Sequence, residues 1–99
     1  PVQSITLSSL VDVGSYILPA KLIEIWGGED LKNLKLLGKL EPQQPTKVIP
    51  SFMKGFECKF NSINAKYIKI EVIPVPKLPK WHSGKGEKAW IFADEILVN

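Results

Sequence analysis

The chain has 99 residues, of which 44% are hydrophobic and 23% are charged, as expected for one globular domain with a single core. No apolar run reaches the roughly 18 residues of a membrane-spanning helix, so we expect no membrane insertion. The net charge is +3, and all 13 positive residues are lysines spread along the chain. Without an arginine fork for phosphates or base edges, nucleic acid is not an expected partner.

Four segments alternate apolar and polar residues with a period of two, which predicts antiparallel strands with one buried face. These segments contain Ile5 and Leu7, then Ile23 and Ile25, then Phe56–Phe60, and then Ile68–Val72. Residues 34–40 and 90–98 add two further expected strands. Cys58 is in phase with its two phenylalanine neighbours, so we expect a small apolar core residue there.

Breaker residues separate the expected strands. They lie at Asp12–Ser15, Gly27–Asp30, Glu41–Thr46 and Pro74–Pro79. The only helical candidate is a short turn at Glu29–Asn33, with Asp30 as its N-cap. Six or seven short strands with long, stiff loops predict an all-β fold, an antiparallel β-sandwich that forms one domain over residues 1–99. Because strand-like sequence follows Pro1 directly, we expect the chain to be a fragment of a larger multidomain protein.

The segment Pro79–Trp90 combines the only histidine with a tryptophan beside it, several lysines and two glycines. A sugar ring offers an apolar face that stacks on an aromatic ring, and its hydroxyls need hydrogen-bond partners. Trp81 could be the stacking platform, with His82, Lys80 and Lys85 as polar partners. The alternative is structural, because the loop could fold back to plug the end of the sandwich.

The other two tryptophans are placed by strand periodicity. Trp26 follows Ile25 and therefore faces away from the buried side, where it could bind sugar or contact another domain of the larger protein. Trp90 is in phase with Phe92, and we expect it in the core.

Several motifs resemble discoidin-like domains, the coagulation-factor type C modules of the galactose-binding-like fold. Ile23–Asp30 and Leu34–Leu40 resemble a strand–loop–strand hallmark of that family, and Ala65–Ile70 resembles its "A-R-Y-I-R-I" strand, with lysines replacing both arginines. Ala93–Ile96 resembles the terminal "A-E-I" strand, with one residue inserted. The segment Leu78–Phe92 is similar to the C-terminal accessory domain of Bacteroidetes-type secreted glycoside hydrolases, notably β-N-acetylhexosaminidases.

The resemblance implies a jelly-roll sandwich from a secreted, periplasmic or cell-surface protein, with ligands usually bound by the loops at one end. It also implies that N-terminal strands of the complete domain are absent here, which would leave a sheet edge open to self-association. Glu95 would correspond to a glutamate that ligates structural calcium in many members. This chain supplies only Asp94 and nearby carbonyls beside it, fewer than the six or more oxygens calcium prefers.

Catalysis is not expected, because Ser83 and His82 lack an acidic partner and one histidine with one cysteine makes no zinc site. The first functional hypothesis is a non-catalytic glycan-binding module, and the second is a structural module packed on the catalytic domain of a parent glycoside hydrolase. Binding to a protein or lipid surface is a third hypothesis, although the loop tips are mainly Gly, Lys and Glu rather than apolar.

Overall fold

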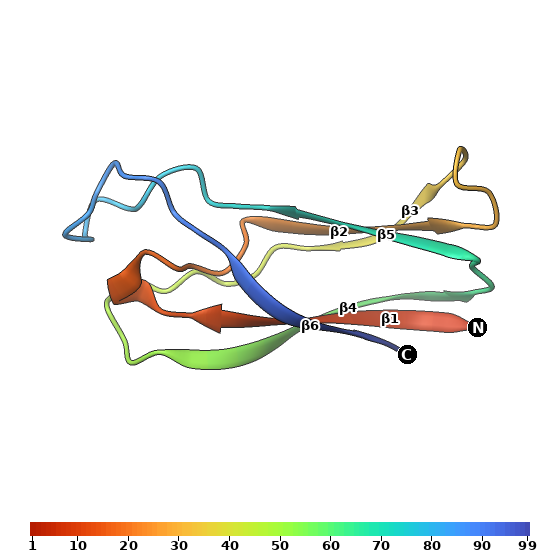
Figure 1. Ribbon diagram of the computed structural model, residues 1–99, viewed down its shortest axis with the longest axis horizontal. Coiled ribbons are helices and arrows are strands. Elements are labelled where there is room, and N and C mark those ends of the chain that lie inside the picture. The colour runs from red at the N-terminus through yellow and green to blue at the C-terminus, as the bar shows by residue number, and fades with distance from the viewer.

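The computed structural model describes all 99 residues, as six strands and one short 3-10 helix (Figure 1). The elements are β1 (Val2–Val11), η1 (Val13–Ser15), β2 (Leu22–Gly28), β3 (Lys35–Leu40), β4 (Phe52–Ile63), β5 (Tyr67–Ile73) and β6 (Phe92–Val98). The predicted all-β fold is confirmed, and each expected strand is present. The one helix, η1, lies within Asp12–Ser15, where the sequence places breaker residues between two strands.

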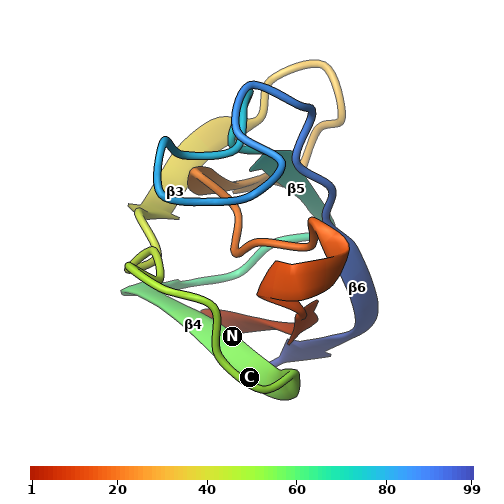
Figure 2. The same ribbon diagram turned by 90° about the vertical axis from the view of Figure 1, so that its left-hand side faces the viewer.

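The strands form two three-stranded antiparallel sheets that face each other as a sandwich (Figures 1 and 2). One sheet has the order β4-β1-β6 and the other has the order β3-β2-β5. Figure 2 shows β3 and β4 on one side of the sandwich and β5 and β6 on the other. Both chain ends lie at one end of the long axis, and the longer loops lie at the opposite end, which we call the loop end (Figure 1).

The core lies between the two central strands. Ile5 and Leu7 of β1 face Ile23 and Ile25 of β2, and each of these side chains is at most 3% exposed. Their polar neighbours point outward, as the period of two requires. Cys58 of β4 is also in this core, which confirms its prediction.

Strand β6 departs from the expected pattern, because every one of its residues is exposed. It is an edge strand bonded only to β1. The prediction that Trp90 is in the core is wrong, since its side chain is 56% exposed. The Trp90 backbone N–H donates to Tyr16 O at 2.8 Å, and its carbonyl oxygen accepts from Leu18 N at 3.1 Å. The Lys88 ammonium lies 4.6 Å from the centroid of its indole ring.

The helical turn expected at Glu29–Asn33 is wrong, because this segment is a turn with no helix, so Asp30 caps none. Asp30 instead holds the turn before β3. Its carboxylate accepts hydrogen bonds from the backbone of Lys32 and the side chain of Asn33, both at 3.0 Å. No helix of the chain is long and apolar enough to cross a membrane.

We predict that Ile25→Ala lowers the free energy of unfolding by about 2–5 kcal/mol, because it leaves a cavity in the centre of the sandwich. Urea denaturation measures this change. Leu31→Ala is the control, since Leu31 is 64% exposed and its removal should change stability by about 0.5 kcal/mol or less. Equal effects of the two substitutions would contradict the assigned core.

Candidate functional site

The loop that contains Trp81 and His82 is tied into the fold by the histidine. His82 is only 2% exposed, and its Nε2 lies 2.6 Å from the carbonyl oxygen of Val13. Its Nδ1 accepts a 2.8 Å hydrogen bond from the backbone N–H of Gly84. Because Nδ1 is an acceptor, the proton of the neutral ring is on Nε2 and is donated to Val13. Both nitrogens are therefore occupied, and neither is free for a sugar hydroxyl.

Tyr16 closes the same cluster from the other side. Its ring packs edge-on against His82, with centroids 5.2 Å apart, and its backbone has the left-handed φ of 69°. Gly84 lies directly against this ring, since a Cβ at Gly84 would be 2.6 Å from Tyr16 Cζ. We call Val13, Tyr16, His82 and Gly84 the histidine clasp. It ties the Trp81–His82 loop to η1 at the loop end of the sandwich.

Trp81 remains outside the clasp. Its side chain is 40% exposed, and its ring centroid is 5.8 Å from that of His82. Lys80 and Lys85 are exposed as well. These three residues can meet a ligand at the loop end, but His82 cannot join them as the polar partner.

Trp26 is not brought near this loop. It lies on the outer face of β2, opposite Lys69 of β5, and β2 runs away from the loop end (Figure 1). A shallow depression beside it is also lined by Leu31, Leu34 and Glu71. The indole Nε1 is buried and has no hydrogen-bond partner. The two tryptophans therefore cannot form one binding surface.

Glu95 lies on β6 and pairs with Ser8 of β1. It is exposed, and no three His, Cys, Asp or Glu side chains of the chain come together as a metal site would require. Asp94 sits at an irregularity in the β1–β6 pairing, where the register shifts between Ser8 and Ser9. The structure adds no carboxylate to the calcium ligands that the sequence supplies.

Cys58 offers no nucleophile. Its side chain is 3% exposed, and burial raises the pKa of its thiol above the ordinary value. At neutral pH the thiol therefore stays protonated and weakly reactive.

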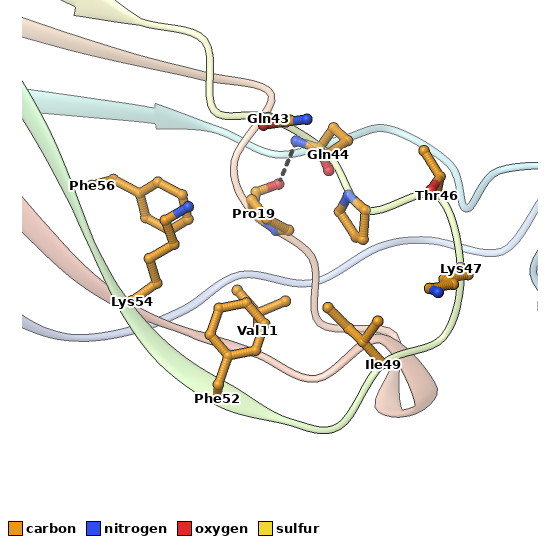
Figure 3. A pocket seen from close by; sticks show the side chains of 11 residues that line it. Val11, Pro19, Gln43, Gln44, Thr46, Lys47, Ile49, Phe52, Lys54 and Phe56 are labelled. Atoms are coloured by element: carbon orange, nitrogen blue, oxygen red, sulfur yellow. Dashed lines mark hydrogen bonds between the residues drawn. The ribbon is translucent and has the colours of Figure 1, made fainter.

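A cavity that the sequence does not predict lies at the loop end, between the start of β4 and the loop of residues 41–51 (Figure 3). Its volume is about 280 Å³, near the lower end of the roughly 300–1,000 Å³ typical of ligand pockets. Phe52 and Val11 form an apolar wall, and Gln43, Thr46 and Lys47 contribute polar groups (Figure 3). Phe52 is 40% exposed, so its ring is open to a ligand.

Gln44 holds the loop against the rest of the fold. Its Nε2 donates to the carbonyl oxygens of Pro19 at 3.1 Å and Ala20 at 3.0 Å. Two carbonyl acceptors fix the amide orientation, because a flipped amide would place its oxygen against them. The Oε1 atom is left buried with no partner. An unpaired buried acceptor costs about 1–3 kcal/mol, which a hydrogen-bond donor supplied at this wall would offset.

The charge of the cavity is positive. Lys47 and Lys54 line it, and no aspartate or glutamate does. The Lys54 ammonium lies 5.4 Å from the Phe56 ring centroid, which holds its stem along the wall. With no carboxylate, histidine or cysteine among the lining residues, the cavity contains no acid–base pair or nucleophile. It can bind a ligand that has an apolar face and polar or anionic substituents.

Sequence periodicity missed this site because its residues come from three separate segments. The signal that was present is the spacing of Phe52 and Phe56, which places both rings on one face of β4. Comparison with known proteins adds no assignment, since neither a family model nor a curated protein matches the chain.

We predict that His82→Ala lowers the free energy of unfolding by about 2–4 kcal/mol, because it removes a buried ring and two hydrogen bonds. Thermal or urea denaturation checks this, with Lys80→Ala as the exposed control. A variant that keeps full stability would contradict the clasp and return His82 to the list of ligand-binding candidates.

Proposed function

We propose that the chain is a non-catalytic carbohydrate-binding module and that a sugar occupies the cavity between β4 and residues 41–51. The observation that carries the proposal is the combination of an exposed Phe52 ring with amide, hydroxyl and ammonium groups around one ring-sized space. As a further part of the proposal, the module belongs to a secreted glycoside hydrolase, as the discoidin-like resemblance implies.

The apolar and polar groups that line the cavity suit a pyranose ring. One face of the sugar ring carries C–H groups that pack on an aromatic ring. The hydroxyls at its rim need donors and acceptors, which Gln43, Thr46 and Lys47 provide. The Gln44 Oε1 atom would accept from a hydroxyl after a small movement of the amide, which would supply its missing hydrogen bond.

The two lysines favour a sugar that carries a carboxylate or another anionic group. Lys47 and Lys54 face no acidic residue in the cavity, so their positive potential is available to the ligand. Trp81 remains a second candidate platform at the loop end, and its role is separable from the cavity by mutation.

A second candidate function is a structural module that docks on the catalytic domain of the parent chain. The exposed Trp90, Phe92 and Leu97 favour it, since they are 56%, 55% and 46% exposed. Large apolar groups at this exposure often belong to an interface between domains or proteins.

We predict that Phe52→Ala weakens sugar binding at least tenfold, or about 1.4 kcal/mol, because the stacking face is lost. Isothermal titration calorimetry against neutral and uronic-acid oligosaccharides measures this. Phe92→Ala is the matched control, because Phe92 is 55% exposed on β6 and lies outside the cavity. Trp81→Ala tests whether the sugar stacks on Trp81 instead of Phe52.

Each result of these binding measurements favours one hypothesis: the cavity, the Trp81 loop or the structural module. Loss of binding in Phe52→Ala alone supports the cavity, whereas loss in Trp81→Ala alone moves the site to the Trp81 loop. If the folded wild-type chain binds none of the galactose, N-acetylglucosamine, N-acetylgalactosamine, fucose or uronic-acid oligosaccharides, the structural module becomes the better assignment.

A further inference from the structure

The net charge of the chain is concentrated at the loop end. Three connecting segments lie there, residues 12–21, 41–51 and 74–91 (Figure 1). They contain six lysines and three acidic residues, a balance of +3 that equals the net charge of the whole chain. The other residues contain seven lysines and seven acidic residues and are neutral as a set. Lysines that are spread along the sequence therefore give one end of the folded molecule its positive charge.

The positive groups at this end are exposed and have no acidic partner. They are the side chains that we call the loop-end lysines: Lys21, Lys47, Lys77, Lys80, Lys85 and Lys88. The two ion pairs of the chain instead join lysines and glutamates within strands β4 and β5. The positive potential of the loop end is therefore not neutralised by the chain itself and attracts an anionic partner.

The size of this end favours a ligand that carries several charges. The molecule is 45 Å long and 23 by 18 Å across, and the loop end is one end of its long axis (Figure 1). Exposed charges act on one another over about 8 Å at physiological ionic strength. A single carboxylate therefore interacts with only some of the loop-end lysines, whereas a chain with a carboxylate on each repeating unit can cross the whole end. The arrangement fits a polyanion better than a small anion.

Aromatic rings beside the lysines indicate a polyanion built from sugars. Trp81 and Trp90 belong to the same segment as four of the loop-end lysines, and their side chains are 40% and 56% exposed. A sugar ring stacks on such a ring while its carboxylate meets an ammonium group. Recognition of phosphates and bases instead relies on the arginine fork, which this chain lacks. An acidic polysaccharide therefore suits this end better than a nucleic acid.

The cavity beside β4 lies at the same end. Lys47 is one of the loop-end lysines and also lines the cavity, and Lys54 lines it from β4. Because the loop end is at most 23 Å wide, sugars that flank the occupied cavity come within reach of other loop-end lysines.

We propose that the loop end binds an acidic polysaccharide, with one carboxylate-bearing sugar in the cavity and the flanking sugars on the loop-end lysines. The inference rests on the proposed function and specifies its substrate class, which is a polymer with repeated carboxylates.

Binding to matched polymers tests the substrate class. The probes are polygalacturonate, alginate and hyaluronate, each compared with its methyl ester, which has the same sugars without the charge. We expect calorimetry to show that at least one acid form binds about tenfold more tightly than its ester. Raising NaCl from about 50 mM to about 500 mM should remove most of that difference, because salt screens exposed ammonium groups. Absence of binding to all three acid forms, equal binding of acid and ester, or equal binding of single-stranded DNA or anionic lipid vesicles would overturn the proposal.

A triple variant locates the surface. Lys80→Gln/Lys85→Gln/Lys88→Gln removes three loop-end charges outside the cavity. We expect it to weaken binding of the acid polymer about tenfold, because fewer ammonium groups face the repeated carboxylates. A disaccharide of the same uronic acid, too short to cross the loop end, should keep its affinity.

The matched control is Lys32→Gln/Lys35→Gln/Lys66→Gln. It removes the same charge from exposed lysines at the β2–β3 and β4–β5 turns, which lie at the opposite end of the molecule (Figure 1). We expect wild-type binding of both polymer and disaccharide. Equal losses in the two triple variants would show a general effect of net charge and would overturn the proposal. Circular dichroism checks the fold of both.

Phe52→Ala distinguishes a failure of this proposal from a failure of the proposed function. Loss of disaccharide binding in Phe52→Ala, together with normal polymer binding in the loop-end triple variant, overturns the polysaccharide surface and leaves the cavity in place. Loss of polymer binding in the loop-end triple variant, with none in Phe52→Ala, supports the loop-end lysines and rejects the cavity.

Discussion

The packing of β1 on β2 is the contact on which the rest of the molecule depends. Only 19 of the 99 residues are buried, and the centre of that set is a single layer of aliphatic side chains between the two middle strands. A layer this narrow covers the inner faces of the central strands but leaves little to cover the ends and sides. Each end and side must then be closed by something else, and the structure closes them unequally. Residues of the histidine clasp close much of the loop end, the β3–β4 side is closed by contact between its strands, and the β5–β6 side stays open.

Two polar side chains at the loop end differ in whether all their hydrogen-bonding atoms have partners. The His82 ring has a partner for each nitrogen and is almost fully buried, so it contributes to stability and has nothing left to offer a ligand. The Gln44 amide uses its nitrogen to hold the loop and leaves its oxygen unpaired. A buried group with spare hydrogen-bonding capacity is a better indication of a ligand than an aromatic residue beside a histidine in the sequence.

The sequence patterns predict the sheets well, because alternation in β1 and β2 states directly which side chains are buried. They fail at β6, where Phe92, Ile96 and Val98 follow the same pattern as a covered strand. Periodicity identifies the two faces of a strand, but whether a neighbouring element covers a face depends on the topology. The same pattern predicts Trp90 in the core, but the topology leaves it exposed. The cavity beside β4 could not be predicted from the sequence, because Val11, Gln44 and Phe52 meet only in the tertiary fold. His82 was placed correctly on a loop, and its contact with Val13, 69 residues away, was beyond any local pattern.

The position of β1 in the middle of its sheet has a consequence for how the chain folds. Ile5 pairs with Val98, so β1 is not bonded on both sides until β6, far along the sequence, is also available. Contacts between residues this far apart in sequence form slowly, because a long loop must be closed before they contribute. During synthesis one side of β1 therefore stays unpaired until β6 has also left the ribosome. Over that interval the unpaired side is open to misassociation, which chaperones that bind extended apolar segments would prevent.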